Sequence, residues 1–505
     1  MTWLADFAAA GQTVARLPWA RVAVTDGGWH QMCSQLGQGS LDLLSLWADG
    51  KTVNLAVRDP GEGLPVVVSF EASKGRFPSV GAMHPAAIWL ERSIRDLFGL
   101  EPVGLPDVRP WLDHGRWPVA HPLGDAKPRH KAPDPYIFLP AEGDGLHQIP
   151  VGPVHAGIIE PGHFRFTASG EAIVRLEERL GYVHKGIDGL MMGADLAQAS
   201  KLAGRTSGDS TVAYQFAFAR AAEAAYGFEP PARAQYLRAL MAELERIANH
   251  LGDIGDICND ASFALMQAHC AVLRERVLRA AHVAFGHRLM RDVIVVGGVA
   301  RDADAKGIVE VRSLVSEIRS KLPSLISLYD RTTSLQDRTV GTGFLAPRLA
   351  RDFAAGGFVG RASGRAFDAR RTLPYAPYDR LAFDVAVRPE GDVNARVWVR
   401  IREVEQSLGL LDQIVEAMPE GPVLGGAPLQ SPSRSVEGAA LVEGFRGDVL
   451  IAVRIGLDGR VERCHMRDPS WFQWPLLEVA IEGNIVADFP LCNKSFNCSY
   501  SGHDL

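Results

Sequence analysis

Cysteines are few in this chain of 505 residues, and long apolar runs are missing. The six cysteines have no framework spacing, which predicts buried thiols in a reducing compartment rather than disulfides. The longest apolar runs, such as residues 293–296, fall far short of the ~20 residues that a membrane-spanning helix needs. The first residues lack the basic and apolar regions of a signal peptide. We therefore expect a chain without a membrane span of its own.

A strong excess of one charge is also missing. The formal net charge is −6, and acidic and basic residues are mixed, so the basic stripe of a nucleic-acid binder is absent. The nucleophile motif G-x-S-x-G is absent as well, so serine catalysis is not expected. With 47% hydrophobic residues the chain can bury a large core, and its length predicts two or more domains of roughly 150 residues each.

A small α/β domain is predicted for residues 1–122. Three short segments there alternate or are β-branched, as strands do: 41–48, 53–57 and 65–70. A helix is predicted over 84–98, because Pro85 suits a first helical turn and Gly99 suits a C-terminal cap.

A linker and a larger domain are predicted to follow. Residues 123–148 are rich in proline and glycine, a composition that favours an extended spacer. Residues 149–505 are predicted to form a domain centred on a helix bundle with peripheral strands, which makes the fold class α+β. Helices are expected over 194–226 with a break near 204–211, and over 231–257, 262–289, 305–330, 394–412 and 474–483. Strands are expected at 163–167, 383–387, 449–455 and 461–466.

The predicted helix over 231–257 carries a polar edge. Glu243, Arg246 and His250 lie side by side along one border of its apolar stripe. Two interpretations are open: the edge faces a site or a partner, or the three residues form a buried network that satisfies itself.

Within the first domain, residues 89–100 read WLERSIRDLFGL, followed by P-D-V-R at 106–109 and H-P-L at 121–123. This pattern of acid, base and aromatic at fixed offsets resembles the C-type (30-kDa-like) subunit of respiratory complex I. For the charges of this helix a structural or interface role is favoured, because an exposed ion pair contributes only ~0–1 kcal/mol.

From residue 151 to residue 505 the chain carries a second set of motifs. They are G-P-x-H at 152–155, E-P-G-H-F at 160–164, G-Y-V-H-K-G at 181–186, E-L-E-R-I-A-N-H-L at 243–251, G-G-V at 297–299, R-A-S-G at 361–364 and R-D-P at 467–469. This part resembles the large subunit of nickel-iron hydrogenases and the D-type (49-kDa-like) subunit of complex I. The fused arrangement most resembles group 4 energy-converting hydrogenases of the formate hydrogenlyase and hydrogenase-4 type.

The metal ligands that the resemblance implies are absent. In nickel-iron hydrogenases two C-x-x-C loops supply four thiolates, and soft thiolates suit nickel. The corresponding positions here are Ser207 and Ser210 in the first loop, and Ser499 and Gly502 in the second. A serine hydroxyl is hard and stays protonated near neutral pH, and glycine has no side chain. We therefore expect no nickel or iron and no cofactor bound by this chain, with quinone as a candidate ligand.

The resemblance also implies site residues. Glu160 matches the hydrogenase glutamate that passes protons beside the metals; alternatively, its carboxylate accepts backbone hydrogen bonds in a turn. His155 matches a histidine of the quinone-binding loop of the D-type subunit, and His163 is a candidate for the second histidine of that loop. Arg205 matches the arginine that faces the nearest iron–sulfur cluster of the partner small subunit, and Arg361 is a further candidate for cofactor binding.

These features predict a subunit that forms the cavity between a small iron–sulfur subunit and a membrane arm with antiporter-like and H-type-like subunits. It is expected to lie peripherally on the cytoplasmic side of the inner membrane, where electron transfer, with quinone as a candidate acceptor, is coupled to ion movement. The alternative is a redox-silent scaffold or coupling subunit of such a complex. An active nickel-iron hydrogenase is the least favoured interpretation.

Overall fold

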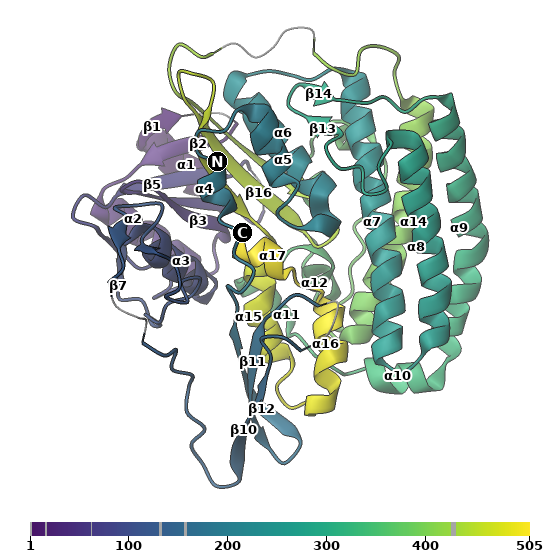
Figure 1. Ribbon diagram of the computed structural model, residues 1–505, viewed down its shortest axis with the longest axis horizontal. Coiled ribbons are helices and arrows are strands. Elements are labelled where there is room, and N and C mark those ends of the chain that lie inside the picture. Colours follow the sequence, from purple (N-terminus) through teal and green to yellow (C-terminus); the bar gives the residue numbers. More distant parts are fainter. Residues whose placement is uncertain (1–2, 16–17, 62, 131–133, 156–158, 426–430) are drawn as a thin grey trace.

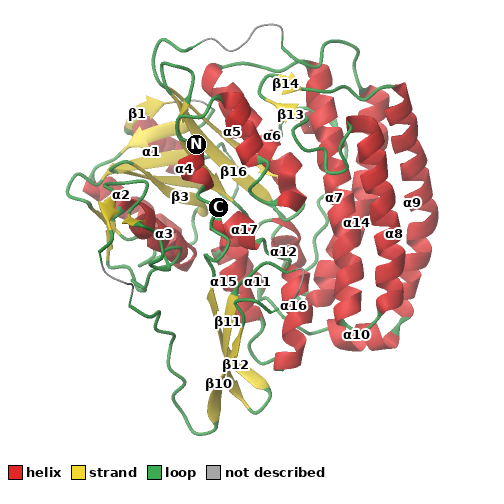
Figure 2. Ribbon diagram, in the orientation of Figure 1, coloured by secondary structure: helices red, strands yellow, loops and turns green. Residues whose placement is uncertain are grey.

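A computed structural model describes residues 3–15, 18–61, 63–130, 134–155, 159–425 and 431–505. A strand-rich N-terminal unit lies on one side of the molecule, a bundle of long helices lies on the other, and the C-terminal helices lie between them (Figure 1). Helices and strands are both abundant, as the predicted α+β class requires (Figure 2).

A five-stranded sheet forms the N-terminal unit, in the order β1-β2-β5-β4-β3. Strands β2 and β5 pair in parallel, and the other neighbours are antiparallel. Its elements are α1 (Trp3–Ala10), β1 (Gln12–Ala15), β2 (Ala20–Ala23), α2 (Asp26–Gly37), β3 (Asp42–Asp49), β4 (Thr52–Arg58), β5 (Val66–Glu71) and α3 (Ile88–Phe98). All three predicted strands are confirmed. The predicted helix is confirmed too, although its first turn is a 3-10 turn, η1 (Pro85–Ala87), and it ends at Gly99 with a φ of 71°.

The bundle contains α7 (Ala232–Asp260), α8 (Ala264–Phe285), α9 (Ala305–Arg331) and α14 (Val393–Ala417) (Figure 2). The apolar side chains that recur at helical spacing along α7, among them Leu237, Leu244 and Leu251, are fully buried. Two further helices, α5 (Leu196–Ala203) and α6 (Thr211–Tyr226), flank the break that the sequence predicts near 204–211. The bundle therefore follows from the apolar periodicity of the sequence.

Two antiparallel sheets complete the larger domain. One has the order β10-β11-β12 and the other the order β15-β16-β17. They comprise β10 (Leu146–Val151), β11 (His163–Ser169), β12 (Ala172–Arg179), β15 (Val436–Glu443), β16 (Asp448–Ile455) and β17 (Val461–Arg467). Strands β11, β16 and β17 were predicted, whereas β12 was missed because residues 177–179 are charged yet buried, which hides the alternation of a strand.

The strand predicted at 383–387 is wrong, because these residues adopt no regular structure. A strand needs a neighbouring strand to satisfy its backbone groups. Side chains of α14 bind the backbone here instead: just before the segment, the Gln413 amide accepts from the N–H of Ala382 and donates to its carbonyl, both at 2.8 Å. Gln406, on the same helix, accepts from the Asp384 N–H at 3.4 Å.

The remaining elements are short, and most of them connect or cap the larger ones. They are β6 (Arg76–Pro78), β7 (Glu101–Val103), β8 (Val119–Ala120), β9 (Lys127–Pro128), α4 (Ile187–Met191), η2 (Gly208–Ser210), β13 (Ile294–Val295), β14 (Gly298–Val299), α10 (Thr333–Thr339), α11 (Pro347–Asp352), α12 (Gly357–Ala362), α13 (Ala369–Thr372), η3 (Tyr378–Arg380), α15 (Ser470–Ala480), η4 (Val486–Asp488), α16 (Phe489–Phe496) and α17 (Tyr500–Asp504).

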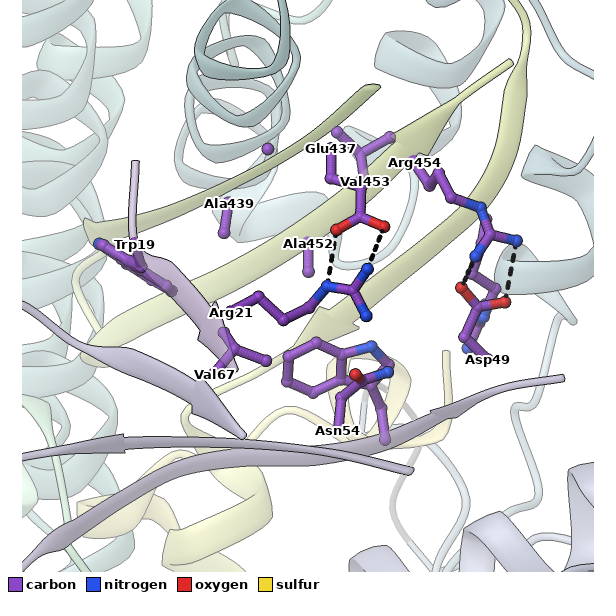
Figure 3. Close-up of a pocket in the computed structure, with 13 residues that line it drawn as sticks. Trp19, Arg21, Asp49, Asn54, Val67, Glu437, Ala439, Ala452, Val453 and Arg454 are labelled. Atoms are coloured by element: carbon purple, nitrogen blue, oxygen red, sulfur yellow. Dashed lines mark hydrogen bonds and ion pairs between the residues drawn. The ribbon is translucent and has the colours of Figure 1, made fainter. Parts of the chain in front are cut away.

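The N-terminal sheet packs against β15 and β16 of the larger domain, and two ion pairs bridge them (Figure 3). Arg21 binds Glu437 at 2.8 Å, and Arg454 binds Asp49 at 3.1 Å. Between them lies a small cavity of about 70 Å³. The apolar core of the N-terminal unit also continues into β11, β12 and α15, so the two parts of the chain share one core.

Candidate functional site

The two loops that resemble metal-binding loops lie in direct contact. The first connects α5 to α6, and the second connects α16 to α17 at the end of the chain. The Ser207 Oγ and the Ser499 Oγ are 2.9 Å apart and share a hydrogen bond across 292 positions of sequence. Both residues are buried. The structure therefore brings the predicted ligand positions of both loops together.

Arg446, which was not among the predicted site residues, joins the two loops through an ion pair and a hydrogen bond. The Arg446 guanidinium contacts both Asp209 oxygens, at 2.7 and 2.6 Å, and donates to the Asn497 carbonyl at 2.5 Å. Asp209 in turn accepts from the Ser207 and Ser210 hydroxyls at 2.8 and 3.2 Å. Burial alone would raise the pKa of Asp209, but the adjacent Arg446 outweighs it and lowers this pKa to about 2.

The second loop is held by its own backbone. The Ser499 Oγ accepts from the Gly502 N–H at 2.8 Å, which makes Ser499 the N-cap of α17. Gly502 has no room for a side chain, because a Cβ atom there would lie 2.5 Å from an Asp468 carboxylate oxygen. The same Asp468 oxygen accepts from the hydroxyl of buried Tyr214 at 2.6 Å.

Nickel and iron do not fit these residues. Ser207 and Ser210 direct their hydroxyls to Asp209, and the Ser499 oxygen caps a helix. Neutral hydroxyls are hard ligands, and nickel in a shared dinuclear site calls for soft thiolates. The fourth position, Gly502, offers no ligand atom and its surroundings leave no space for one. The residues at this site therefore do not form a nickel-iron centre.

The six cysteines do not compensate for the missing ligands. All are buried free thiols. Cys498 lies next to the second loop, and burial, reinforced by the Glu178 carboxyl, raises its pKa well above the usual range. A thiol must ionise before it can bind a metal. In the folded chain burial therefore favours the protonated form of Cys498, which packs beside the second loop.

Glu160 and His155 lie beside the second loop. Glu160 is exposed, and its Oε2 accepts from the Ser501 N–H at 3.0 Å. The His155 ring lies 6.4 Å from the Tyr500 ring, and its Nε2 is buried without a hydrogen-bond partner among the described residues. Burial lowers the pKa of His155, so a neutral ring is favoured. The Glu160 carboxylate thus accepts a backbone hydrogen bond from the second loop rather than from its own turn, and this bond fixes an exposed carboxylate at that loop.

His163 is directed away from the loops. It lies on β11 next to Phe164, whose ring packs against Tyr500, and successive side chains of a strand point to opposite faces. Its ring packs at a tilt of 43° against the Phe138 ring, with centroids 4.9 Å apart, and its Nε2 accepts from Arg165 at 3.3 Å. Burial lowers the pKa of His163. The alternation of the strand therefore turns the His163 ring away from Tyr500, while its Nδ1 lies 3.3 Å from the Gly152 carbonyl, in the segment that carries His155.

Arg205 occupies the outer end of the first loop. Its guanidinium forms a bidentate ion pair with Asp292, whose Oδ2 lies 2.7 Å from the Nη2. The two side chains are 38% and 33% exposed, so they are accessible to a partner surface. Just inside, the Lys185 ammonium donates to the carbonyls of Thr206 and Arg205 at 2.6 and 3.1 Å.

Arg361 lies deep in the bundle rather than at the loops. Its side chain is fully buried and donates to Glu403 and Glu443, both at 2.8 Å. The geometry gives it a role in holding the two carboxylates inside the core.

The polar edge of α7 belongs to the same buried network. Arg246 contacts Glu243 at 3.3 Å, and His250 hydrogen-bonds to Glu403 at 2.7 Å. All three α7 residues are buried and bonded within the core, which agrees with the buried-network interpretation, although the His250 Nδ1 has no hydrogen-bond partner among the described residues. On α3, Glu91 is likewise buried and bonded within the protein: it accepts from the backbone N–H groups of Val80 and Gly81.

Sequence reasoning missed Arg446 and Asp468, the two residues that clamp and shape the loops. Asp468 stands in the R-D-P motif at 467–469, so its motif gave a signal. Arg446 stands 237 positions from Asp209, in a segment without a distinguishing pattern. Only the folded chain reveals its role.

In comparison with known proteins, two family models match this chain. A family model described as "Respiratory-chain NADH dehydrogenase, 30 Kd subunit" matches residues 45–132, and one described as "Respiratory-chain NADH dehydrogenase, 49 Kd subunit" matches residues 261–438. Formate hydrogenlyase subunit 5 of Escherichia coli (strain K12) is 34% identical over 453 residues, which cover 87% of this chain and 79% of that protein. This chain belongs to the family of fused 30-kDa and 49-kDa subunits.

Other members of the fused family have related names. The fused C/D subunit of the NADH-quinone oxidoreductase of Phocaeicola vulgatus is 28% identical over 462 residues, covering 85% of this chain and 88% of that protein. Among solved structures, a chain of the membrane-bound sulfane sulfur reductase, an archaeal respiratory membrane complex, matches with a TM-score of 0.67 and 27% identity. That match covers 72% of this chain and 99% of the other. The predicted relationship to complex I and to energy-converting hydrogenases is confirmed.

No helix among the described residues is both long and apolar enough to cross a membrane. Other relatives of this chain are named as subunits of a membrane-bound hydrogenase and of an archaeal respiratory membrane complex. Members of this family are thus subunits of membrane-bound oxidoreductase complexes.

Proposed function

We propose that this chain is a metal-free core subunit of a complex-I-like or hydrogenase-related membrane complex, lying between the iron–sulfur cluster of a partner and the membrane arm. One observation carries the proposal. The two loops keep their contact, with the Ser207 and Ser499 oxygens 2.9 Å apart, while none of the four ligand positions carries a thiolate. The two loops that resemble metal-binding loops are thus in contact, and none of their four expected ligand positions carries a thiolate.

The proposed partners are a small iron–sulfur subunit next to Arg205 and membrane-arm subunits of the antiporter-like and H-type-like classes. The exposed ion pair of Arg205 and Asp292 supports the first of these, because an accessible cation suits a surface that faces a cluster. The names of the relatives support the membrane arm. A position on the cytoplasmic side of the inner membrane is part of the same proposal.

Electrons that reach the partner's cluster are proposed to pass to a quinone at the surface formed by His155, Glu160 and the second loop. Reduction of a quinone to a quinol consumes two electrons and two protons. Glu160 is suited to deliver protons, since it is exposed and its carboxylate is fixed by the Ser501 N–H at 3.0 Å. His155 offers a buried, unpartnered Nε2 for a quinone oxygen.

The test uses the complex isolated from membranes through a tag on this chain. After reduction with dithionite, the iron–sulfur clusters are reoxidised with a short-chain quinone and followed by stopped-flow absorbance. Replacing Glu160 with glutamine should slow reoxidation about tenfold, which corresponds to about 1.4 kcal/mol in the barrier. The matched control, Glu171→Gln, changes an exposed glutamate in the turn between β11 and β12 and should leave the rate unchanged.

Metal analysis of the same preparation separates this proposal from an active hydrogenase. Nickel is expected to be far below one atom per chain. One nickel atom per chain would overturn the metal-free assignment.

A redox-silent scaffold is the second candidate function. The direct contact of Ser207 with Ser499 favours it, because two of the expected ligand positions bond to one another instead of to a metal or substrate. Unchanged reoxidation in both Glu160→Gln and His155→Ala would favour this scaffold over a quinone-reducing role.

Replacing Arg205 or Asp292 should shift the midpoint potential of the partner's nearest cluster in opposite directions. A unit charge about 10 Å from a cluster, at an effective dielectric constant of about 20, contributes about 1.7 kcal/mol, or about 70 mV for one electron. Arg205→Gln should lower the midpoint potential of the partner's nearest cluster, and Asp292→Asn should raise it. Because both side chains are about one-third exposed, screening keeps each shift below about 70 mV.

Potentiometric titration followed by electron paramagnetic resonance measures both shifts. Arg279→Gln serves as the control, because its side chain is 68% exposed and paired within α8. Shifts of the same sign in the two variants would contradict the placement of a cluster beside Arg205.

A further inference from the structure

A cavity of about 210 Å³ lies between the first loop and two helices of the bundle. Helices α7 and α8, which are neighbours in the bundle (Figure 1), form two of its walls. Residues 208–209 of the first loop and residues 288–290, just after α8, complete it. Most side chains that line the cavity are apolar, among them Leu244, Ala248 and Val277. The cavity is thus an apolar space that adjoins the first loop.

One charged side chain of this cavity has no partner. Arg274, on α8, is half-buried, and its guanidinium forms no hydrogen bond or ion pair with any described residue. The arginine lies against α7 at Gly252, where a Cβ atom would come within 3.0 Å of the Arg274 Cδ and 3.2 Å of its Nε. A glycine at this point of α7 therefore leaves room for the arginine beside the cavity.

Both acids that line the cavity are bound elsewhere. The two Asp209 oxygens contact the Arg446 guanidinium, which balances their charge. The Glu245 carboxyl accepts from the backbone N–H groups of Val212 and Ala213 at 2.7 and 3.1 Å. Burial raises the pKa of Glu245 to about 8, so its neutral form is favoured near neutral pH. These two acids therefore leave the cavity with a positive charge.

The remaining polar side chains of the described lining add no second unpaired cation. The Asn249 amide donates to the carbonyls of Asp209 and Glu245 at 2.8 and 2.9 Å. Arg288 is 58% exposed, and its guanidinium pairs with Glu275 at 3.1 Å. The cavity thus joins one unpaired guanidinium to apolar walls, and this combination suits an anion with an apolar body.

A carboxylate fits this cavity better than a phosphate or a sulfate. One guanidinium pairs with one carboxylate through two parallel hydrogen bonds. A phosphate or sulfate has further oxygens that the apolar walls cannot bind, and burial of polar atoms without hydrogen bonds is costly. The volume equals that of about seven water molecules at about 30 Å³ each, which is room for about seven non-hydrogen atoms. An unbranched carboxylate of about five carbons has this size.

We propose that this cavity binds a carboxylate on a short aliphatic chain, with the carboxylate paired to Arg274 and the chain packed between α7 and α8. The carboxylate belongs either to a free monocarboxylic acid or to an acidic side chain of a partner subunit, since the same chemistry recognises both. The site adjoins the first loop at Gly208 and Asp209 but takes no part in the contact of Ser207 with Ser499. Binding here therefore does not depend on the proposed electron-transfer role.

The test is isothermal titration calorimetry of the whole chain with sodium pentanoate and with pentanamide, which has the same length but no charge. Saturable binding of pentanoate at one site is expected, with pentanamide at least tenfold weaker. Arg274→Gln should weaken pentanoate at least tenfold, and the variant should fold because the arginine has no partner to lose. Arg312→Gln is the control, since Arg312 is an exposed arginine of α9 that does not line the cavity.

Titration of the isolated complex identifies the source of the carboxylate. Binding of pentanoate to both the chain and the complex indicates a free acid. Binding to the chain alone indicates that an acidic side chain of a partner fills the cavity in the complex. Equal affinities for the two compounds, unchanged binding in Arg274→Gln, or no saturable binding of pentanoate to the chain at millimolar concentration would each overturn the proposal.

Hydrogen exchange locates the binding independently. Amides of residues 208–213 should exchange more slowly when pentanoate is bound, because residues 208–209 line the cavity and the amides of Val212 and Ala213 donate to Glu245 in its wall. Slower exchange confined to other parts of the chain would place the ligand elsewhere and overturn the proposal. None of these outcomes bears on the reoxidation rates that test the proposed function.

Discussion

The free energy of unfolding should fall by about 3–5 kcal/mol when Arg361 is replaced by methionine. Methionine keeps much of the length of the side chain but removes its charge and all its donors. Glu403 and Glu443, each 2.8 Å from the guanidinium, would then remain in the core without their shared cation. A buried carboxylate that loses its partner must either stay charged at high cost or take up a proton. Urea denaturation followed by tryptophan fluorescence measures the change.

Arg348→Met is the matched control for this prediction. Arg348 is also paired with an acid, Asp352 at 3.3 Å, but its side chain is 86% exposed. Exposed pairs of this kind contribute about 0–1 kcal/mol, so the control should differ little from the natural protein. A loss of less than about 1 kcal/mol in Arg361→Met would mean that the network is not the structural centre of the bundle that its burial indicates.

Replacing Glu178 with glutamine should change the pH dependence of stability. Glu178 lies on β12, is 1% exposed, and neither of its carboxylate oxygens has a hydrogen-bond partner among the described residues. Its backbone N–H donates to the Glu478 carboxylate at 2.8 Å. Burial raises the pKa of Glu178 well above its usual range, and the nearby Glu478 raises it further. Burial therefore favours the protonated, neutral form of Glu178 in the folded chain.

The sign of the effect follows from proton binding. Between the unfolded pKa near 4.5 and the higher folded pKa, the folded chain holds a proton that the unfolded chain has released. The stabilising contribution is complete below the unfolded pKa and is lost as the pH rises toward the folded pKa, by up to about 1.4 kcal/mol per pH unit. As the pH rises above the unfolded pKa, the natural protein should therefore lose stability that the Glu178→Gln variant keeps.

Urea denaturation at a series of pH values provides the measurement. Glu171→Gln is again the control, since Glu171 is exposed in the adjacent turn and its removal should leave the pH profile unchanged. If the natural protein and the Glu178→Gln variant show parallel profiles, Glu178 is ionised in the folded chain, and a polar group that binds its charge has to be found.

Local patterns in the sequence predicted much of the fold. The apolar spacing of residues 231–257 predicted α7, and Pro85 with Gly99 predicted the limits of the first-domain helix, because these signals act over a few neighbouring residues. The strand predicted at 383–387 failed because a strand also requires a partner strand, and within this segment the Asp384 N–H binds the Gln406 side chain of α14 instead. Strand β12 was missed because Glu177, Glu178 and Arg179 are charged, which hides the alternation of a strand, and only tertiary contacts bury them.

The family and the loss of the four thiolates could be read from the residues alone, since Ser207, Ser210, Ser499 and Gly502 stand at the ligand positions of two motifs. How the loops meet required the folded chain. The 2.9 Å contact of Ser207 with Ser499 and the clamp of Arg446 on Asp209 join residues more than two hundred positions apart. Such contacts leave no local periodicity. For the same reason, only the three-dimensional arrangement turned the His163 ring away from Tyr500 and placed Arg361 in the core.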